Sequence, residues 1–291
     1  MLKRALLLFI FVSLLVLVLG CIAPAPPKPG KEVVKVSIQP VYSLHIVSQK
    51  YSPLFRYLSR ETGYDIRVVS AMRYDNYLPI LEAHQVHIGI QNPLAYVTLV
   101  KTRGAYPLVK MVHPDGNTSY RGVIITSQGS GINRIEDLKG KKVVAASRRA
   151  VGGFLGQAVV CKDNGIDVDR DLHLSLIGTQ DAVIYAVYQG KAEAGFVRED
   201  ALPLLVRERI DLTRLNIIAY TDFFPTWCVA AFENTAPGVA TEIAKALLNL
   251  DWEESEEREV LESVGIAGFA QVSDSDYDII REAMDTANIP Y

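Results

Sequence analysis

Residues 120–154 carry the pattern that most constrains the fold of this 291-residue chain. Two apolar runs rich in β-branched residues, 120–126 and 142–146, flank a polar stretch that contains one turn of helix at 135–138. Apolar runs of this length bounded by turn residues predict buried β-strands. The segment therefore reads as strand, short helix and strand, leading straight into a glycine-rich turn.

That turn, Gly152-Gly153, lies between the second strand and an apolar helix start. Glycine lets the backbone approach a ligand closely, and the free N–H groups at a helix start favour an anion. The turn is therefore a candidate ligand cradle. The alternative is an ordinary strand-to-helix turn, so the prediction depends on support from the rest of the chain.

Short apolar runs alternate with helical patterns from residue 33 onward. The expected strands are 34–39, 66–70, 87–91, 106–112, 120–126, 142–146, 172–177, 193–197, 215–220 and 227–232. The expected helices are 52–62, 77–83, 153–165, 180–189, 200–208, 237–250 and 254–263, together with a helix that Asn92-Pro93 opens and that holds Tyr96. The first begins with Ser52 as cap and Pro53 in its first turn. This alternation predicts an α/β fold with mostly parallel sheets covered on both faces.

The N-terminus has the pattern of an export signal. Residues 1–20 begin with Lys3 and Arg4 and continue as an apolar run that is short for a membrane span. Cys21 follows in Val-Leu-Gly-Cys, which resembles a lipobox and predicts lipidation of Cys21; the alternative is an uncleaved anchor. Either way we expect an exported chain tethered to the outer face of the cytoplasmic membrane.

Residues 21–32 are proline-rich and predict an extended tether. The remainder, about 260 residues, is long enough for two lobes with sizeable cores. The net charge of −3 gives no basic excess, so no nucleic-acid partner is expected.

No motif of a known catalytic site is present in the sequence. There is no G-x-S-x-G, H-E-x-x-H, phosphate-binding loop or dinucleotide fingerprint, and the five histidines are scattered. We therefore expect no catalytic residue, no cofactor and no metal site.

Several segments resemble the phosphonate/phosphate-type substrate-binding proteins of ABC importers. Residues 120–144, YRGVIITSQGSGINRIEDLKGKKVV, are similar to the entry of the second lobe in that family. The matching segments elsewhere are Ser37 to Pro40 with Tyr42-Ser43, YSPLFRYL at 51–58, Asn76-Tyr77, QNPLAY at 91–96, and the tail VGIAGF with SDSDYD and Arg281-Glu282. The resemblance covers nearly everything from residue 33 onward.

This resemblance implies a two-lobed fold of the periplasmic-binding-protein type II class, with mixed, mostly parallel sheets. Lobe 1 would comprise residues 33–119 and 223–291, and lobe 2 residues 120–222. A hinge motion at the two crossings would close the cleft on a small anion, and the closed monomer would deliver it to a permease with its ATPase. Of the remaining cysteines, Cys161 would lie on a helix of lobe 2 and Cys228 on a strand of lobe 1, so a disulfide is not expected.

Ligands of open α/β sheets bind beyond the carboxyl ends of the strands. The candidate contacts of lobe 1 are Tyr42, Ser43, Tyr77, Gln91, Asn92 and Tyr96. For each tyrosine the alternative is ordinary packing, and ligand contact is favoured for Tyr96, which follows a helix cap and matches the motif. The candidates elsewhere are Tyr120, Ser147, Arg149, Val151, Gly152, Gly153, Gln180, Asp181, Arg198 and Trp227. Trp227 would wall the cleft, with core packing as its alternative.

Three departures from the family pattern bear on the ligand. Where the family has a hydroxyl-rich S-T-S-G-Y turn, this chain has AVGGF at 150–154. Gln180 replaces the histidine of the family's G-H-D-A element, and Arg198 replaces an acidic residue. Guanidinium groups pair bidentately with carboxylate or phosphate, so Arg198 with Arg148 or Arg149 would replace the lost hydroxyls. The alternative for Arg148 and Arg149 is solvation on a loop. Arg198 has the alternative of pairing with Glu199 or Asp200.

The favoured function is therefore a substrate-binding lipoprotein of an ABC importer that captures a phosphonate- or phosphate-class anion. The alternative is a binding module for another small anion, a carboxylate or sulfonate, in import or membrane signalling. An enzyme is the third and least favoured hypothesis.

Overall fold

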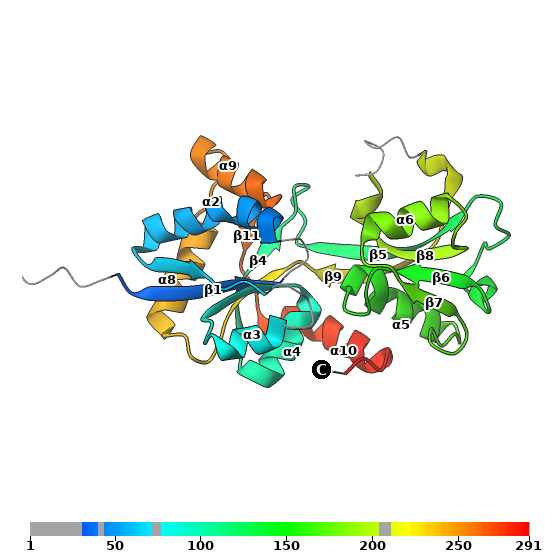
Figure 1. Cartoon of the computed structure of the whole chain (residues 1–291), viewed down its shortest axis with the longest axis horizontal. Helices are drawn as coiled ribbons and strands as arrows, with labels where there is room; N and C mark the ends of the chain where they lie inside the picture. The colour runs from blue at the N-terminus through cyan, green and yellow to red at the C-terminus, as the bar shows by residue number, and fades with distance from the viewer. Residues whose placement is uncertain (1–30, 40–43, 72–76, 204–210, 291) are drawn as a thin grey trace, which may run out of the picture. The chain divides into compact units, whose positions relative to one another are not determined.

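Two β-sheets, each with helices on both faces, organise the chain (Figure 1). The computed structural model describes residues 31–39, 44–71, 77–203 and 211–290. The expected signal sequence, most of the tether and Cys21 lie outside the described residues, as do Tyr42 and Ser43. Among the described helices, none is long and apolar enough to cross a membrane.

The first sheet has the strand order β11-β4-β10-β3-β1-β2. Its strands are β1 (Val33–Ile38), β2 (Asp65–Val68), β3 (Ile88–Gln91), β4 (Tyr106–Val112), β10 (Cys228–Ala231) and β11 (Gly268–Ala270). The second sheet has the order β7-β6-β8-β5-β9. Its strands are β5 (Ser119–Ser127), β6 (Lys142–Ala145), β7 (His173–Leu176), β8 (Ala194–Arg198) and β9 (Leu215–Pro225). The chain passes between the sheets twice, from β4 to β5 and from β9 to β10.

Most helices lie between strands, as the sequence pattern predicts, whereas helix α10 and strand β11 near the C-terminus were not expected. They are α2 (Leu44–Thr62), α3 (Tyr77–Ala83), α4 (Pro93–Arg103), α5 (Gly156–Asp163), α6 (Gln180–Tyr188), α8 (Pro237–Leu248), α9 (Ser255–Val264) and α10 (Asp278–Thr286). Short 3₁₀ helices occur at Ile135–Leu138, Glu199–Ala201, Leu212–Arg214 and Asp274–Tyr277, and a π-helical turn occurs at Val151–Leu155.

Side-chain alternation along the strands explains why both faces of each sheet are covered. Val229 and Ala231 of β10 pack with α2, α8 and α9, whereas Cys228 and Ala230 pack with α3, α4 and α10. Because successive side chains of a strand point to opposite faces, an uninterrupted apolar strand needs helices on both sides. Figure 1 shows the same layering in the second sheet, with α5 and α6 on opposite faces.

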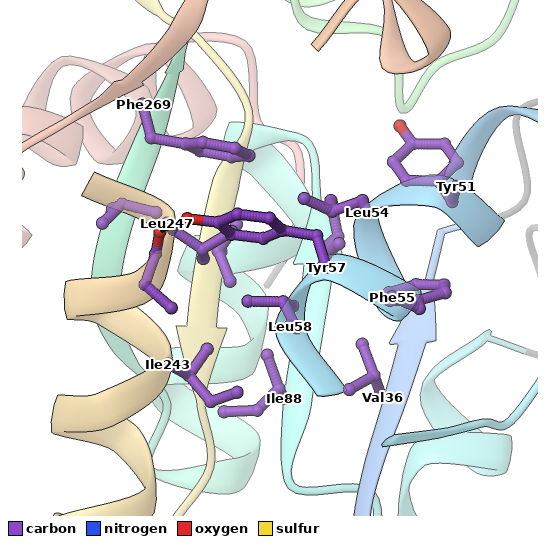
Figure 2. Packing of buried hydrophobic residues seen from close by; sticks show 14 of the residues in the cluster. Val36, Tyr51, Leu54, Phe55, Tyr57, Leu58, Ile88, Ile243, Leu247 and Phe269 are labelled. Atoms are coloured by element: carbon purple, nitrogen blue, oxygen red, sulfur yellow. Dashed lines mark hydrogen bonds between the residues drawn. The ribbon is translucent and has the colours of Figure 1, made fainter. Parts of the chain in front are cut away.

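Figure 2 shows the core between α2, α8 and the first sheet. Leu54 and Leu58 of α2 point toward Ile243 and Leu247 of α8, and these side chains are at most 3% exposed. The hydroxyl of Tyr57 donates to the Ala246 carbonyl at 3.0 Å, so this buried polar group is satisfied. Apolar contacts thus hold α2 and α8 together over this sheet, and the hydrogen bond of Tyr57 satisfies the hydroxyl group buried among them.

The start predicted for the first helix is wrong. Helix α2 begins at Leu44, and Pro53 lies inside it instead of in its first turn. A buried apolar stripe at helical spacing runs up to and past the proline, and it includes Val47, Tyr51 and Leu54. Burial of this continuous apolar stripe outweighs the cost of one missing backbone hydrogen bond.

The sheets are mixed, as expected, but they are not mostly parallel. Among the described strands, five neighbouring pairs are antiparallel and four are parallel. The antiparallel pairs all involve β4, β5, β9 or β10, the strands on either side of the two crossings between sheets. A chain that leaves a sheet and later returns to it can add a strand in the opposite direction. The βα alternation of the sequence does not reveal this.

Two further boundaries differ from expectation. Strand β9 continues to Pro225 because it pairs with β5 as far as Ser119, well past the predicted end at residue 220. A 3₁₀ turn at Glu199–Ala201 stands at the start of the helix expected at 200–208, and residues 204–210 lie outside the described part.

Gly89 of β3 provides a test of core packing. A Cβ there would lie 2.7 Å from Cζ of buried Phe232 and 2.3 Å from Oε1 of buried Gln91. We expect Gly89→Ala to lower the free energy of unfolding by about 1–3 kcal/mol, the usual cost of overpacking. At Gly238, near the start of α8, a Cβ would meet no atom within 4 Å. The matched Gly238→Ala should raise the free energy of unfolding by about 0.5 kcal/mol. Urea unfolding that gave equal losses for both variants would contradict this account of the core.

Candidate functional site

The parallel pairing of β1 with β3 brings two polar side chains together at the carboxyl ends of these strands. Gln39, directly after β1, accepts a hydrogen bond from the Asn92 backbone N–H at 2.9 Å through Oε1. Its Nε2 donor is buried and has no hydrogen-bond partner among the described residues. A buried amide donor without a partner is costly, which makes Gln39 a candidate ligand contact.

Asn92 joins this edge of the first sheet to the second. Its Oδ1 accepts from the Ala95 N–H at 2.8 Å and so caps α4, which has Pro93 at its first position. Its Nδ2 donates to the Arg149 backbone carbonyl at 3.1 Å. The predicted contact Asn92 thus holds the start of α4 against the loop that leads to the glycine turn.

Tyr77 and Gln91, also predicted contacts, are satisfied inside the protein. The Tyr77 hydroxyl donates to Gln91 Oε1 at 3.0 Å, and Gln91 Nε2 donates to the Cys228 carbonyl at 3.3 Å. Both residues are at most 1% exposed. In this structure they fix the geometry beneath the strand ends.

Tyr96 is also buried, away from the strand ends. Its hydroxyl donates to the Asp274 carboxylate, and its ring centroid lies 4.5 Å from that of Tyr277. Burial, followed by the hydrogen bond to Asp274, raises the pKa of Tyr96 well above its usual value. Asp274 is held in turn by Arg281 at 2.8 Å. These contacts give Tyr96 a structural role that ties the C-terminal segment to α4, the packing alternative stated for the tyrosines.

The glycine turn is a π-helical turn, Val151–Leu155, that continues into α5. Both glycines are buried, and protein side chains occupy the space that a Cβ would fill. A Cβ on Gly152 would lie 2.8 Å from the Tyr120 ring, and one on Gly153 would lie 2.2 Å from Gln180 Nε2. The close approach that glycine permits here is therefore to Tyr120 and Gln180, two other predicted contacts.

Gln157, which no sequence pattern marks as a site residue, fixes this turn to the second sheet. Its fully buried Nε2 lies 2.8 Å from the Gly152 carbonyl, 3.0 Å from that of Val197 and 3.2 Å from that of Val123. A Cβ on Gly122 would lie 2.3 Å from the same nitrogen. One side chain thus links the turn to β5 and β8.

Arg198, at the end of β8, lies against the same turn. Its Cγ would be 3.2 Å from a Cβ on Gly152, and its guanidinium carbon lies 4.4 Å from the centroid of the Tyr120 ring. Its backbone N–H donates to Gln180 Oε1 at 2.9 Å. Its Nε donates to Asp200 Oδ1 at 2.9 Å, with a second bond from an Nη to Oδ2. Asp200 is one of the two partners that we considered for Arg198.

The remaining predicted contacts are distributed around this group. Ser147 Oγ accepts from the Arg149 N–H at 3.2 Å, Val151 is 2% exposed, and Asp181 lies exposed in the first turn of α6. Trp227 is half-buried and packs against the core of the first sheet, the alternative stated for it.

The structure therefore brings together Asn92, Tyr120, Arg149, Gly152, Gly153, Gln180 and Arg198. Tyr96 and Trp227 have packing roles elsewhere. Gln39 and Gln157 were missed. For Gln39, the rule that selected Gln91, a polar residue just after a buried strand, would have found it. Nothing in the sequence marks Gln157, whose role depends on contacts with β5 and β8.

The described residues hold no cluster of His, Cys, Asp or Glu suited to a metal ion. Cys161 of α5 and Cys228 of β10 are free and buried in separate apolar clusters, as expected. Burial raises the pKa of the Cys161 thiol to about 12, so it is a poor nucleophile.

His113 lies just after β4, with Nδ1 3.9 Å from the Asp200 carboxylate. Burial and then the charge of Arg198 lower the pKa of His113, while Asp200 acts in the opposite direction. The unfolded chain therefore binds a proton at His113 at a higher pH than the folded chain does. The stability that this neutral imidazole contributes is present above about pH 6.5 and is lost as the pH falls below that value.

We therefore expect His113→Asn to lose less thermal stability than the native chain between pH 7.5 and pH 5. His173→Asn, a change at an exposed position on β7, is the control and should follow the native profile. Melting temperatures measured across this range test the prediction, and parallel curves for the native and His113→Asn proteins would contradict it.

A family model described as ABC transporter, phosphonate, periplasmic substrate-binding protein matches residues 36–277. The tetrathionate sensor histidine kinase TtrS of Salmonella typhimurium is 30% identical over 143 residues, which is 44% of this chain and 24% of the kinase. The chain thus spans about a quarter of the length of that relative. The phosphate-import protein PhnD of Mycolicibacterium smegmatis is 22% identical over 274 residues, 87% of this chain and 85% of that protein.

Among solved structures, PhnD1 from Prochlorococcus marinus in complex with methylphosphonate has a TM-score of 0.75 at 15% identity, covering 88% of this chain and 98% of that one. At this identity the likeness shows the fold, which is the two-lobed α/β fold that we expected. The match of the family model over most of the sequence decides the family. The chain belongs to the family of periplasmic substrate-binding proteins of phosphonate ABC transporters.

Proposed function

We propose that this chain captures a small oxyanion of the phosphonate or phosphate class and delivers it to an ABC permease with its ATPase. The ligand would lie between the carboxyl-end edge of the first sheet and the glycine turn of the second, and a hinge motion at the two crossings would enclose it. The family to which the chain belongs supports the transport role. A catalytic role is not part of the proposal.

The observation that carries the preference for an anion is the position of Arg198. Its guanidinium stacks on Tyr120 beside the glycine turn, and its side chain is only 27% exposed. A guanidinium presents paired N–H donors that match two oxygens of a phosphonate, phosphate or carboxylate. Arg198 would therefore supply the recognition that hydroxyl groups supply in the S-T-S-G-Y turn of related sequences.

Contacts connect Arg198 to the first sheet. Gln39 bonds to Asn92, Asn92 bonds to Arg149, and Arg149 leads through Ala150 to Gly152, which packs on Arg198. Gln39 Nε2, which has no partner among the described residues, would add a donor from the first sheet. The start of α4, whose helix dipole favours negative charge, lies beside it.

A specific observation favours a second candidate function. The relative with 30% identity is named a tetrathionate sensor histidine kinase, and its matched region is 143 residues long. A binding module of the same fold would then report the presence of a sulfur oxyanion or a carboxylate to a membrane receptor. Both functions require reversible anion binding at the same site.

We further propose that the mature chain begins at Cys21, carries lipid there and acts as a monomer on the outer face of the cytoplasmic membrane. The lipobox-like residues before Cys21 and the proline-rich tether after it support this proposal. Lipid on an exported chain would keep the binding module close to its permease.

Ligand binding is tested with the full-length chain in detergent, by calorimetry with methylphosphonate, phosphate, ethanesulfonate, succinate and tetrathionate. We expect a phosphonate or phosphate to bind, and Arg198→Met to weaken binding about tenfold or more. This estimate is lower than the effect for a fully buried charge pair because the guanidinium is partly exposed.

Arg121→Met is the matched control. Like Arg198, Arg121 is paired with a carboxylate, that of Glu199 at 2.6 Å, and stacks on aromatic rings. It follows Tyr120 directly on β5, so its side chain faces the other side of the sheet. Arg121→Met should therefore leave the affinity for the anion unchanged. Binding of succinate or tetrathionate alone would favour the second function, and no binding of any of the five anions would overturn the proposal.

Cys21→Ser tests the lipid anchor. Because the lipid is attached through the cysteine sulfur, the variant should move from the membrane pellet to the soluble fraction of lysed cells and lose incorporation of a labelled fatty acid. A variant that stayed in the pellet would indicate an uncleaved N-terminal anchor.

A further inference from the structure

Asp200 holds the guanidinium that we assign to the ligand. It follows Arg198 by two residues, and both of its carboxylate oxygens accept hydrogen bonds from that guanidinium. This is the bidentate geometry that an external carboxylate or phosphonate would also adopt. Asp200 occupies the edge formed by Nε and Nη2, so an anion that binds this edge of Arg198 has to replace the Asp200 carboxylate.

Arg198 does not need Asp200 to stay in place. Its stem packs on Gly152, its guanidinium stacks on Tyr120, and its backbone N–H is bonded to Gln180. Tyr120 is only 7% exposed, so this platform is itself fixed in the core. The guanidinium would remain positioned for an anion after Asp200 had moved away.

Asp200 can leave at low cost. Its side chain is 43% exposed, so the displaced carboxylate returns largely to water. His113 Nδ1, 3.9 Å away, offers a second polar neighbour on the side of the first sheet. A partly exposed ion pair of this kind contributes little to stability, and a small anion can replace it with its own hydrogen bonds to the guanidinium.

We propose that Asp200 is an intramolecular competitor that lowers the affinity of the anion site at Arg198. The proposal rests on the function proposed above. Asp200 is tethered beside the guanidinium and offers it a carboxylate, so the chain itself occupies the site in the absence of ligand. A phosphonate, a phosphate or a monocarboxylate that takes the same edge of the guanidinium has to displace the same group, so Asp200 lowers the affinity for each of them by the same factor.

Asp200→Asn in the full-length chain tests this inference, because it removes the competing charge and keeps the shape. At pH 8 we expect affinity for methylphosphonate and phosphate to rise about fivefold. Affinity for acetate should rise by a similar factor, because each anion displaces the same carboxylate. Asp200→Ser, measured in the same way, guards against an effect particular to asparagine.

Glu199→Gln is the matched control. It removes one negative charge from the neighbouring residue, but Glu199 pairs with Arg121 on the opposite face of the sheet. A rise confined to the Asp200 variants supports competition, whereas an equal rise in Glu199→Gln would show a general effect of net charge and overturn the proposal.

Other outcomes separate this inference from the proposed function. Unchanged affinity in both Asp200 variants, with binding by the native chain, overturns the competitor and leaves the function standing. Lower affinity in both would show that Asp200 positions Arg198 and would also overturn it. Absence of anion binding in the native chain and in every variant overturns the inference and the function together.

Discussion

The close approach of the Val151–Leu155 turn to the second sheet is the constraint on which the site depends. Three glycines permit it. At Gly122, Gly152 and Gly153 a Cβ would fall within 3 Å of Gln157, Tyr120 and Gln180, respectively. Gln157 then bonds to the carbonyls of Gly152, Val123 and Val197. A larger side chain at any of these glycines would push the turn from the sheet and alter the platform on which Arg198 lies.

Charge near the turn is balanced by two similar units on opposite faces of the second sheet. Arg198 pairs with Asp200 over Tyr120, and Arg121 pairs with Glu199 against Tyr220 and Phe223. The alternation of side chains along β5 separates them, since Tyr120 and Arg121 are neighbours in sequence and point in opposite directions. Of these two units, Arg198 is the one that packs on Gly152 of the glycine turn, and this difference in surroundings, not in chemistry, is why we propose it as the anion site.

The sequence predicted much of the architecture because local patterns reflect local physics. The β-branched runs became β5 and β6, and Asn92-Pro93 capped α4 as the residue types require. It failed at Pro53, where the burial of a long apolar stripe outweighed a local helix-stop signal. It also failed on strand direction, which is set by where the chain re-enters a sheet. For Tyr96 the sequence motif could not distinguish a ligand contact from a buried hydroxyl, since Asp274, its partner, is 178 residues away.

The sequence by itself determined the α/β class, the order of strands and helices, the position of the glycine turn and the presence of arginines near it. These follow from periodicity, from turn residues and from similarity to related chains. Only the tertiary structure decided that the space beside the glycines is filled by Tyr120 and Gln180, that Gln39 has a buried donor with no partner among the described residues, and that Asp200 takes the guanidinium of Arg198. Packing and ion pairing depend on distances between segments far apart in the chain, and no local pattern of residues encodes those distances.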